Sequence, residues 1–231
     1  MIDAVILCGG LGTRLRSVIG EHAKVMAQVN GRPFLDRIMD QLRGQGARRV
    51  ILCTGYQAQE IEAYYQANPG MAVLFSRETT PLGTGGALQL ASGLIASDDF
   101  FVFNGDSFCP ADLDALLSFH RQKNSLGTLA VSRVDNGADF GAVIFDAAQR
   151  ILAFHEKSAF APAGPVFANA GIYCFSKKIF VLTPQREKFS LEYDLFPQLV
   201  AQGLYAFVTE SSFHDIGTPE RIARARGEGN R

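Results

Sequence analysis

The feature that most constrains this chain is a short apolar segment that leads directly into a glycine-rich turn near the N-terminus. Residues 2–7 are mostly apolar and β-branched, which is typical of a buried parallel strand. The turn reads L-C-G-G-L-G-T-R-L over residues 7–15, with three glycines in four positions. Glycine lets backbone N–H groups approach an anion closely, and Thr13 and Arg14 add side-chain donors. The pattern predicts a polyphosphate-binding turn, with an ordinary strand-to-helix turn as the alternative.

The spacing of these glycines separates the turn from two common nucleotide-binding motifs. It lacks the Lys-Ser/Thr ending of a P-loop. Gly9, Gly10 and Gly12 also do not form the G-x-G-x-x-G of a dinucleotide-binding fold. A different kind of phosphate-binding turn is therefore expected.

Composition limits the class of protein. The 231 residues are 47% hydrophobic and 19% charged, as in a soluble globular protein with one sizeable core. No apolar segment approaches the roughly 20 residues that span a membrane, and no secretory signal is evident, so we expect no membrane partner and a cytoplasmic location. A net charge of −1 argues against a nucleic-acid partner. The four cysteines show no C-x-x-C spacing, and we expect buried free thiols.

Strand-like segments alternate with amphipathic helical segments through the first half of the chain, which predicts a parallel sheet with helices on both faces. After the N-terminal strand, further strands are expected at residues 50–53, 73–75 and 100–103. The second half has closely spaced strand-like segments at 128–133, 142–145, 151–156 and 171–175, and helical patterns near 191–202 and 219–225. We expect one α/β domain, with a mixed, mainly parallel sheet and a small antiparallel lobe that could cover a ligand.

Two aspartates stand at positions suited to a metal ion. Asp106 follows the fourth strand in an N-G-D motif, at the carboxyl end where such sheets place their ligands. A carboxylate there is a good Mg²⁺ ligand beside phosphates, and an Asx-turn that caps the next helix is the alternative. Asp215 lies in F-H-D-I-G-T-P, residues 213–219, before a tight turn that opens a helix. A helix-capping turn is the alternative for this second site.

Three further segments carry groups suited to an anionic or polar ligand. Residues 81–87, P-L-G-T-G-G-A, form another glycine-rich helix start that could lie against a flat base edge. In H-E-K-S, residues 155–158, Lys157 could pair with a phosphate while Glu156 accepts from sugar hydroxyls. A surface ion pair is the alternative there. Lys24 stands in a loop, where a lone lysine is usually solvated.

Taken in order, these motifs resemble the sugar-1-phosphate nucleotidyltransferase family, and the resemblance spans essentially the whole chain. It also includes F-G-A-V at residues 140–143 and N-A-G-I-Y at 169–173. It implies a Rossmann-like fold of the nucleotide-diphospho-sugar transferase type. It further implies transfer of a nucleoside monophosphate from an NTP to a sugar 1-phosphate, with a nucleotide-binding half at about 1–110 and a sugar-phosphate-binding half at about 111–231.

The resemblance implies roles for individual residues. The expected catalytic residues are Arg14, Lys24 and Asp106. The expected Mg²⁺ ligands are Asp106 and Asp215. The expected nucleotide-binding residues are Leu7, Gly9, Gly10, Gly12, Thr13, Arg14, Glu78, Pro81, Gly83, Thr84 and Gly105. The expected sugar-phosphate-binding residues are Gly141, Glu156, Lys157 and Asn169.

One branch of the family fits the sequence best. The sequence looks most like D-glycero-α-D-manno-heptose 1-phosphate guanylyltransferases, which make a GDP-heptose for surface polysaccharide. Three segments carry this likeness: L-R-S-V at residues 15–18, G-R-P-F-L at 31–35 and F-S-L-E-Y-D-L-F-P at 189–197. GTP is then the expected nucleotide, and Glu78 could accept from guanine N–H groups, although a solvated loop acid is the alternative. Mannose 1-phosphate guanylyltransferase and N-acetylmuramate 1-phosphate uridylyltransferase remain alternatives, as does a non-catalytic nucleotide-sugar binding protein. The sequence does not decide between a monomer and a homodimer.

The chain departs from the family pattern beside the loop lysine. Most relatives have a proline immediately before that lysine, where this chain has Ala23. A proline would restrict the backbone of the loop, so the geometry of Lys24 depends on what replaces that restriction.

Overall fold

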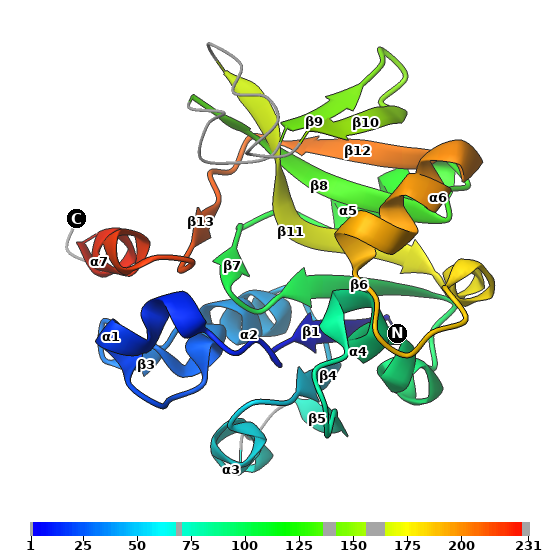
Figure 1. The fold of residues 1–231 in the computed structure, drawn as a ribbon. Coiled ribbons are helices and arrows are strands. Elements are labelled where there is room, and N and C mark those ends of the chain that lie inside the picture. Colours follow the sequence, from blue (N-terminus) through cyan, green and yellow to red (C-terminus); the bar gives the residue numbers. More distant parts are fainter. Residues whose placement is uncertain (1, 68–70, 136–141, 156–164, 228–231) are drawn as a thin grey trace.

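The structure is a computed structural model that describes residues 2–67, 71–135, 142–155 and 165–227. Among these residues, nine strands form the main sheet, and helices cover both of its faces (Figure 1). The main helices are α1 (Arg16–Ile19), α2 (Leu35–Gly44), α3 (Ala58–Gln66), α4 (Gly83–Ala91), α5 (Leu113–Gln122), α6 (Phe196–Gln202) and α7 (Pro219–Gly227). No helix in the described part of the chain is long and apolar enough to span a membrane.

The parallel part of the sheet is built by the first half of the chain. Strand β1 (Asp3–Leu7) lies between β4 (Arg49–Thr54) and β6 (Asp99–Asn104), and β4 pairs with β5 (Ala72–Arg77), all in parallel. The order β5-β4-β1-β6 means that the connections leave β1 in both directions. Ligand-binding crevices in open α/β sheets form at the carboxyl ends of strands at such a reversal.

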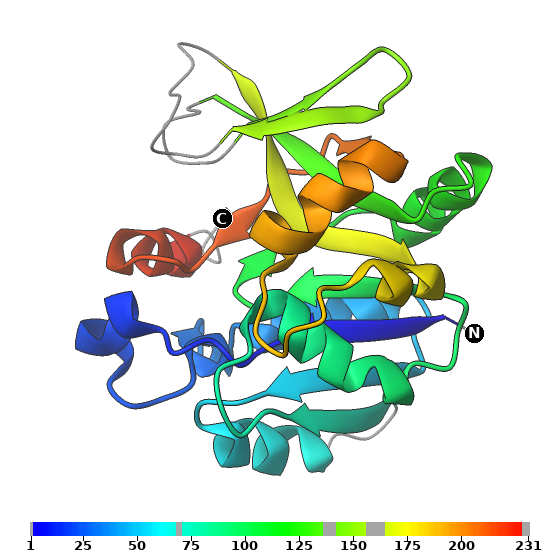
Figure 2. The same cartoon turned by 45° about the vertical axis from the view of Figure 1, so that its right-hand side comes forward.

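The second half of the chain extends the sheet with antiparallel pairs. The long strand β11 (Val166–Ser176) runs antiparallel to β6 and to β8 (Gly127–Val134), and β8 pairs in parallel with β12 (Leu204–Thr209). Strands β9 (Ala142–Phe145) and β10 (Ile151–His155) form an antiparallel pair at the far edge of the sheet (Figure 2).

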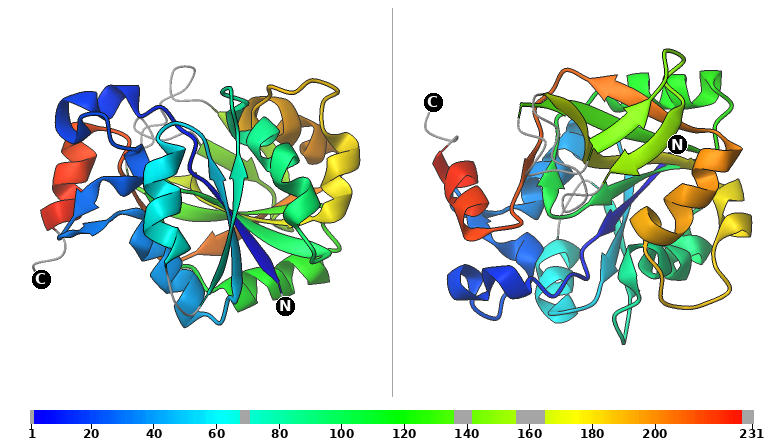
Figure 3. Two further views of the ribbon diagram at one scale, coloured as in Figure 1. Left: turned by 90° about the horizontal axis from the view of Figure 1, so that it is seen from below. Right: turned by 45° about the horizontal axis from the view of Figure 1, so that its top comes forward.

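The core has two layers because successive side chains of a strand point to opposite faces. In β1, Ala4 and Ile6 pack with residues of α2, α3 and α5, whereas Val5 packs with residues of α4 and α6. Seen from below, α3 and α4 lie on opposite sides of the strands (Figure 3). The continuous apolar character of the parallel strands is thus explained by burial on both faces.

A third, smaller apolar cluster joins the two ends of the chain. Leu15 and Ile19 from the N-terminal region pack with Ile216 and with Ile222 of α7. A two-residue antiparallel pair of β7 (Ser107–Phe108) with β13 (His214–Asp215) leads the chain back to this cluster. A second small pair, β2 (Gln28–Val29) with β3 (Arg32–Pro33), lies ahead of α2.

The expected fold class is confirmed: the chain forms a mixed, mainly parallel sheet flanked by helices, with a small antiparallel lobe. All four cysteines are free and buried, as predicted. The sequence pattern did not indicate β12 or the two-residue strands, whereas α4 begins at Gly83, within the helix start expected at residues 81–87. The strand expected at 151–156 is described up to His155.

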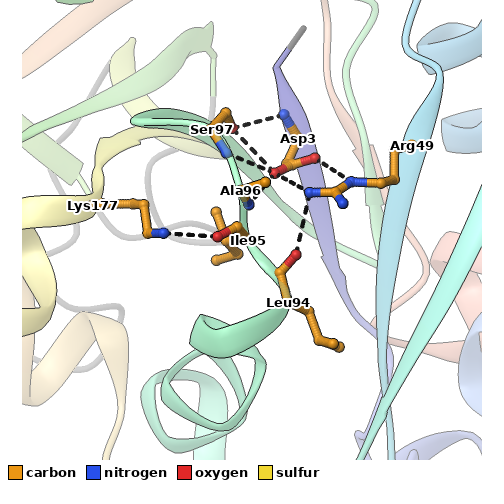
Figure 4. Close-up of polar contacts among 7 residues, drawn as sticks. All are labelled: Asp3, Arg49, Leu94, Ile95, Ala96, Ser97 and Lys177. Carbon is orange, nitrogen blue, oxygen red and sulfur yellow. Dashed lines mark hydrogen bonds and ion pairs between the residues drawn. The ribbon is translucent and has the colours of Figure 1, made fainter.

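A buried carboxylate ties the amino ends of the parallel strands together. Asp3 accepts two hydrogen bonds from Arg49 at 2.7 Å, and backbone N–H groups of Ala96 and Ser97 donate to it at 2.6 and 3.0 Å (Figure 4). Its side chain is only 4% exposed. Burial alone would raise the pKa of Asp3, but the hydrogen bonds from Arg49, Ser97 and Ala96 outweigh burial and lower the pKa to about 2.

The lowered pKa makes part of the stability depend on acid. Because the folded pKa lies below the ordinary 3.8, Asp3 contributes stability above about pH 4 that is lost as the pH falls toward 2. The contribution is on the order of 2 kcal/mol. In urea unfolding from pH 7 to pH 2.5, we expect the wild type to exceed Asp3→Asn in unfolding free energy by an amount that shrinks below pH 4. A difference that stays constant over this range would contradict the assignment.

Candidate active site

A cavity of about 480 Å³ opens at the carboxyl ends of the parallel strands. Leu7 ends β1, Glu78 follows β5, and Asn104 ends β6, so three strands contribute to its wall. The remaining lining residues come from the turn after β1, the start of α4 and three other segments: Cys8, Gly9, Gly10, Leu11, Lys24, Val25, Pro81, Gly83, Thr84, Ala87, Asp106 and Glu192. The glycine-rich turn thus shares one cavity with Glu78 and residues 81–87, the two parts of the chain that were expected to contact the nucleotide base.

The glycine-rich turn is held against a carboxylate. A Cβ on Gly9 would lie 2.7 Å from Oε1 of Glu78, and one on Gly55 would lie 2.6 Å from the same oxygen. Glycine at both positions therefore lets Glu78 approach the turn. The backbone N–H of Leu82 donates to Oε2 of Glu78 at 3.0 Å. Burial raises the pKa of Glu78, and the hydrogen bond from Leu82 opposes this rise.

Lys24 and Asp106 form an ion pair at the cavity wall. Nζ of Lys24 lies 2.6 Å from Oδ2 of Asp106, and the side chains are 12% and 38% exposed, respectively. Gly12 has a φ of +56°, and a Cβ there would lie 3.1 Å from Cβ of Lys24, so the lysine stem packs against the glycine-rich turn. The pair places one cation and one carboxylate next to the space that a ligand would fill.

A segment distant in sequence, residues 187–192, covers the start of α4; we call it the strap. The carbonyl of Phe189 accepts from the N–H groups of Gly85 and Gly86 at 3.0 and 3.2 Å. Thr84 donates from Oγ1 to Oε2 of Glu192 at 2.8 Å. The strap carbonyl thus satisfies two of the N–H groups that a helix start leaves free.

Gly86 lies so close to the strap that a larger residue there should lower the stability of the protein. A Cβ on Gly86 would lie 2.2 Å from the backbone oxygen of Glu187 and 2.9 Å from Cβ of Leu82. We expect Gly86→Ala to lower the unfolding free energy by about 1–3 kcal/mol in urea titrations, because the strap must move away. Gly93→Ala is the control, because a Cβ on Gly93 meets nothing within 4 Å. Equal stability of the two variants would rule out the strap contact as a constraint.

Nine of the predicted site residues line the cavity: Leu7, Gly9, Gly10, Lys24, Glu78, Pro81, Gly83, Thr84 and Asp106. Six others, all described, do not contribute to its wall: Gly12, Thr13, Arg14, Gly105, Asn169 and Asp215. Arg14 and Thr13 are exposed on the short helix η1 (Thr13–Leu15), directly after the lining residues of the turn. Gly141, Glu156 and Lys157 lie outside the described residues.

Gly105 has a structural reason to be glycine. Its N–H donates to the carbonyl of Leu7 at 3.0 Å, and a Cβ would lie 2.7 Å from that oxygen. The residue therefore brings the loop after β6 against the end of β1. This contact sets Asp106 beside the glycine-rich turn without placing Gly105 itself in the cavity wall.

Asp215 lies close to Asp106 along the backbone but is held by other groups. The N–H of Ile216 donates to the carbonyl of Asp106 at 3.0 Å, so the two segments are adjacent. The carboxylate of Asp215 accepts from Arg221 at 2.6 Å and from the N–H of Gly217 at 2.7 Å, and it lines a separate cavity of about 40 Å³. Within the described residues, no group of three or more His, Cys, Asp and Glu side chains is placed to hold a metal ion.

Asn169 reaches the cavity through an intermediate residue. Its Nδ2 donates to the phenol oxygen of Tyr173 at 2.9 Å, and Asn104 donates to the same oxygen at 3.2 Å. Tyr173 is fully buried, which raises its pKa. A polar chain thus connects the wall residue Asn104 to Asn169, on the antiparallel side of the sheet.

Sequence reasoning missed six lining residues: Cys8, Leu11, Val25, Ala87, Asn104 and Glu192. The first three adjoin predicted residues, Ala87 belongs to the glycine-rich segment 81–87, and Asn104 belongs to the N-G-D motif. Glu192 lies in the 189–197 motif, which carried a resemblance but no role. Its bond to Thr84 spans 108 residues, so only the tertiary structure shows it as part of the wall.

Comparison with known proteins shows the family of the chain. A family model described as nucleotidyl transferase matches residues 3–228. The D-glycero-alpha-D-manno-heptose 1-phosphate guanylyltransferase of Aneurinibacillus thermoaerophilus is 36% identical over 98% of both chains. The mannose-1-phosphate guanylyltransferase of Mycobacterium tuberculosis is 37% identical over 98% of this chain.

The mycobacterial relative is longer than this chain, and a crystal structure is known for a further relative. This chain spans 64% of the mycobacterial protein. HddC from Yersinia pseudotuberculosis, in a crystal structure complexed with GMP-PN, is 37% identical and has a TM-score of 0.88 over the full length of both chains. The family resemblance that the ordered motifs indicated is confirmed. The chain belongs to the nucleotidyl transferase family.

Proposed function

We propose that this protein transfers the guanylyl group of GTP to D-glycero-α-D-manno-heptose 1-phosphate, giving a GDP-heptose and pyrophosphate for surface polysaccharide synthesis. The observation that carries the proposal is the single cavity in which the glycine-rich turn, Lys24, Asp106 and Glu78 meet. Two heptose 1-phosphate guanylyltransferases, each 36% identical over at least 95% of this chain, support the choice of substrates.

The proposed reaction needs no nucleophile from the protein. An oxygen of the sugar 1-phosphate attacks the α-phosphorus of GTP, and the bond to the β-phosphate breaks to release pyrophosphate. Because both partners are anions, the protein must align them and offset their repulsion. Lys24 at the cavity wall, with Arg14 beside the turn and Lys157, would supply the positive charge.

The carboxylates present suit a divalent cation, which we propose is Mg²⁺. Asp106 lies at the cavity wall with its side chain 38% exposed, and Mg²⁺ prefers one or two carboxylates together with substrate phosphates. Asp106 and Asp215 would hold the ion, with Asp215 exchanging its contact with Arg221 for the metal. When bound, the ion would neutralise charge on the phosphates and align them.

The two substrates would bind to different halves of the chain. We assign the nucleotide to the half at about 1–110, with the base against residues 81–84 and Glu78 as the acceptor for guanine N–H groups. The sugar phosphate would lie in the half at about 111–231, against Gly141, Glu156, Lys157 and Asn169. The four buried free thiols fit a reducing compartment, and we propose a cytoplasmic location.

A mannose 1-phosphate guanylyltransferase is the second candidate, because the mycobacterial relative is as similar in sequence. Pyrophosphate release, measured with each of four nucleoside triphosphates and with several sugar 1-phosphates, separates the candidates. We expect the largest kcat/KM for GTP with the heptose 1-phosphate. Preference for mannose 1-phosphate would favour the second candidate, and preference for UTP would exclude both. Absence of any turnover, together with nucleotide-sugar binding, would identify a non-catalytic binding protein.

A further inference from the structure

The loop that carries Lys24 is fixed by a side chain from a different part of the fold. Glu60, in the first turn of α3, directs both carboxylate oxygens at this loop. Its Oε2 accepts from the backbone N–H of Ala23 at 2.9 Å, and its Oε1 lies 2.6 Å from Nδ1 of His22. The Glu60 side chain is 28% exposed, whereas Ala23 is fully buried. Water therefore cannot easily replace Glu60 as the acceptor for the Ala23 N–H.

The bond to Ala23 restricts the residue that directly precedes Lys24. Ala23 has φ −60° and ψ 137°, and it caps the short helix η2 (Lys24–Met26), with its carbonyl accepting from Met26 at 2.9 Å. The backbone N–H of Ala23 is thus bound by Glu60, and its carbonyl is bound by the N–H of Met26. The φ of −60° is the value that a proline ring imposes, and proline has no N–H to donate.

We propose that Glu60 is a positioning residue for nucleotidyl transfer: by binding the Ala23 N–H it fixes the start of η2 and so sets the Lys24 ammonium against Asp106. It supplies through a hydrogen bond the backbone restriction that a proline at residue 23 would supply through its ring. The inference rests on the proposed function for its effect on rate, since Lys24 acts there on the phosphates. The effect on the loop itself does not depend on the identity of the substrates.

Three single variants separate the hydrogen bond from other effects of Glu60. Glu60→Ala removes the acceptor, whereas Glu60→Gln keeps a neutral acceptor of the same length. His22→Ala removes the exposed ion-pair partner and leaves the bond to Ala23 in place; the His22 side chain is 71% exposed. Gln59→Ala, at an exposed neighbouring position of α3, is the matched control for substitution in this turn of the helix.

The first readout is independent of catalysis. Amide hydrogen exchange of the peptide covering residues 20–27 reports on the order of the loop. We expect faster exchange in Glu60→Ala than in the wild type, and near wild-type exchange in Glu60→Gln and Gln59→Ala. Unchanged exchange in a folded Glu60→Ala variant would overturn the proposal, whatever reaction the protein catalyses.

The second readout is the rate of pyrophosphate release from GTP and heptose 1-phosphate. We expect Glu60→Ala to lower kcat about 10-fold to 100-fold, as a misplaced catalytic group does. Glu60→Gln should stay within about fivefold of the wild type, and His22→Ala within about twofold. Equal losses in Glu60→Ala and Glu60→Gln would contradict the proposal. If the wild type shows no release with any substrate, the proposed function fails while the exchange result still decides the role of Glu60.

Two double variants test the route of the effect. In a Lys24→Met background, Glu60→Ala should change the remaining rate by less than about twofold, because residues that act through one another are not additive. A folded Ala23→Pro/Glu60→Ala variant should recover most of the rate lost in Glu60→Ala. Full additivity in the first case, or a folded second variant as slow as Glu60→Ala, would show that Glu60 does not act through this peptide.

Discussion

Asp106→Ala is expected to lose nearly all activity, with a fall in kcat on the order of 10³ at saturating GTP and Mg²⁺. The carboxylate stands at the cavity wall, where it pairs with Lys24 and is the proposed metal ligand that reaches the phosphates. The fold should survive, because the side chain is 38% exposed and is not part of the apolar core. Steady-state pyrophosphate release and urea unfolding measure the two effects separately.

Asp114→Ala is the matched control for this experiment, since Asp114 is an exposed acid on the nearby helix α5. It should leave both kcat and the unfolding free energy unchanged. Turnover of Asp106→Ala within a few-fold of the control, with Mg²⁺ present, would reject the metal assignment. A large loss of stability in Asp106→Ala would instead assign its carboxylate a structural role.

Lys24→Met is expected to lower kcat on the order of 10² to 10³, the second largest effect. Methionine keeps most of the buried apolar stem that packs near Gly12 but removes the ammonium group 2.6 Å from Asp106. The loss should appear mainly in kcat, because the charge is needed most when the two anions react. Lys178→Met, at an exposed position outside the cavity wall, controls for loss of one positive charge. Equal kcat in the two variants would show that Lys24 is not required.

The fold could be predicted from sequence where the pattern is local. Short apolar segments at residues 50–53, 73–75 and 100–103 predicted three of the parallel strands, β4, β5 and β6. Strand β12 could not be found this way, because what defines it is a parallel pairing with β8 that no local pattern encodes. The helix start within residues 81–87 was recognised, but the carbonyl that completes its first turn, that of Phe189, is about a hundred residues away and no local pattern reveals it.

The lining of the cavity could be predicted where its motifs are contiguous in sequence. The turn after β1, the start of α4 and the N-G-D segment all reach one cavity, because each follows the end of a strand or opens a helix. Asp215 is different: Arg221, in the first turn of α7, holds its carboxylate, and only the structure shows this contact. The absence of a proline at residue 23 is likewise explained by Glu60, 37 residues away.

The most direct test of the account is the mass of the product formed from GTP and D-glycero-α-D-manno-heptose 1-phosphate. The account predicts a GDP-heptose together with an equal amount of pyrophosphate, formed by the wild type and not by Asp106→Ala. Failure to form this product under conditions in which another nucleoside triphosphate or sugar 1-phosphate is converted would contradict it.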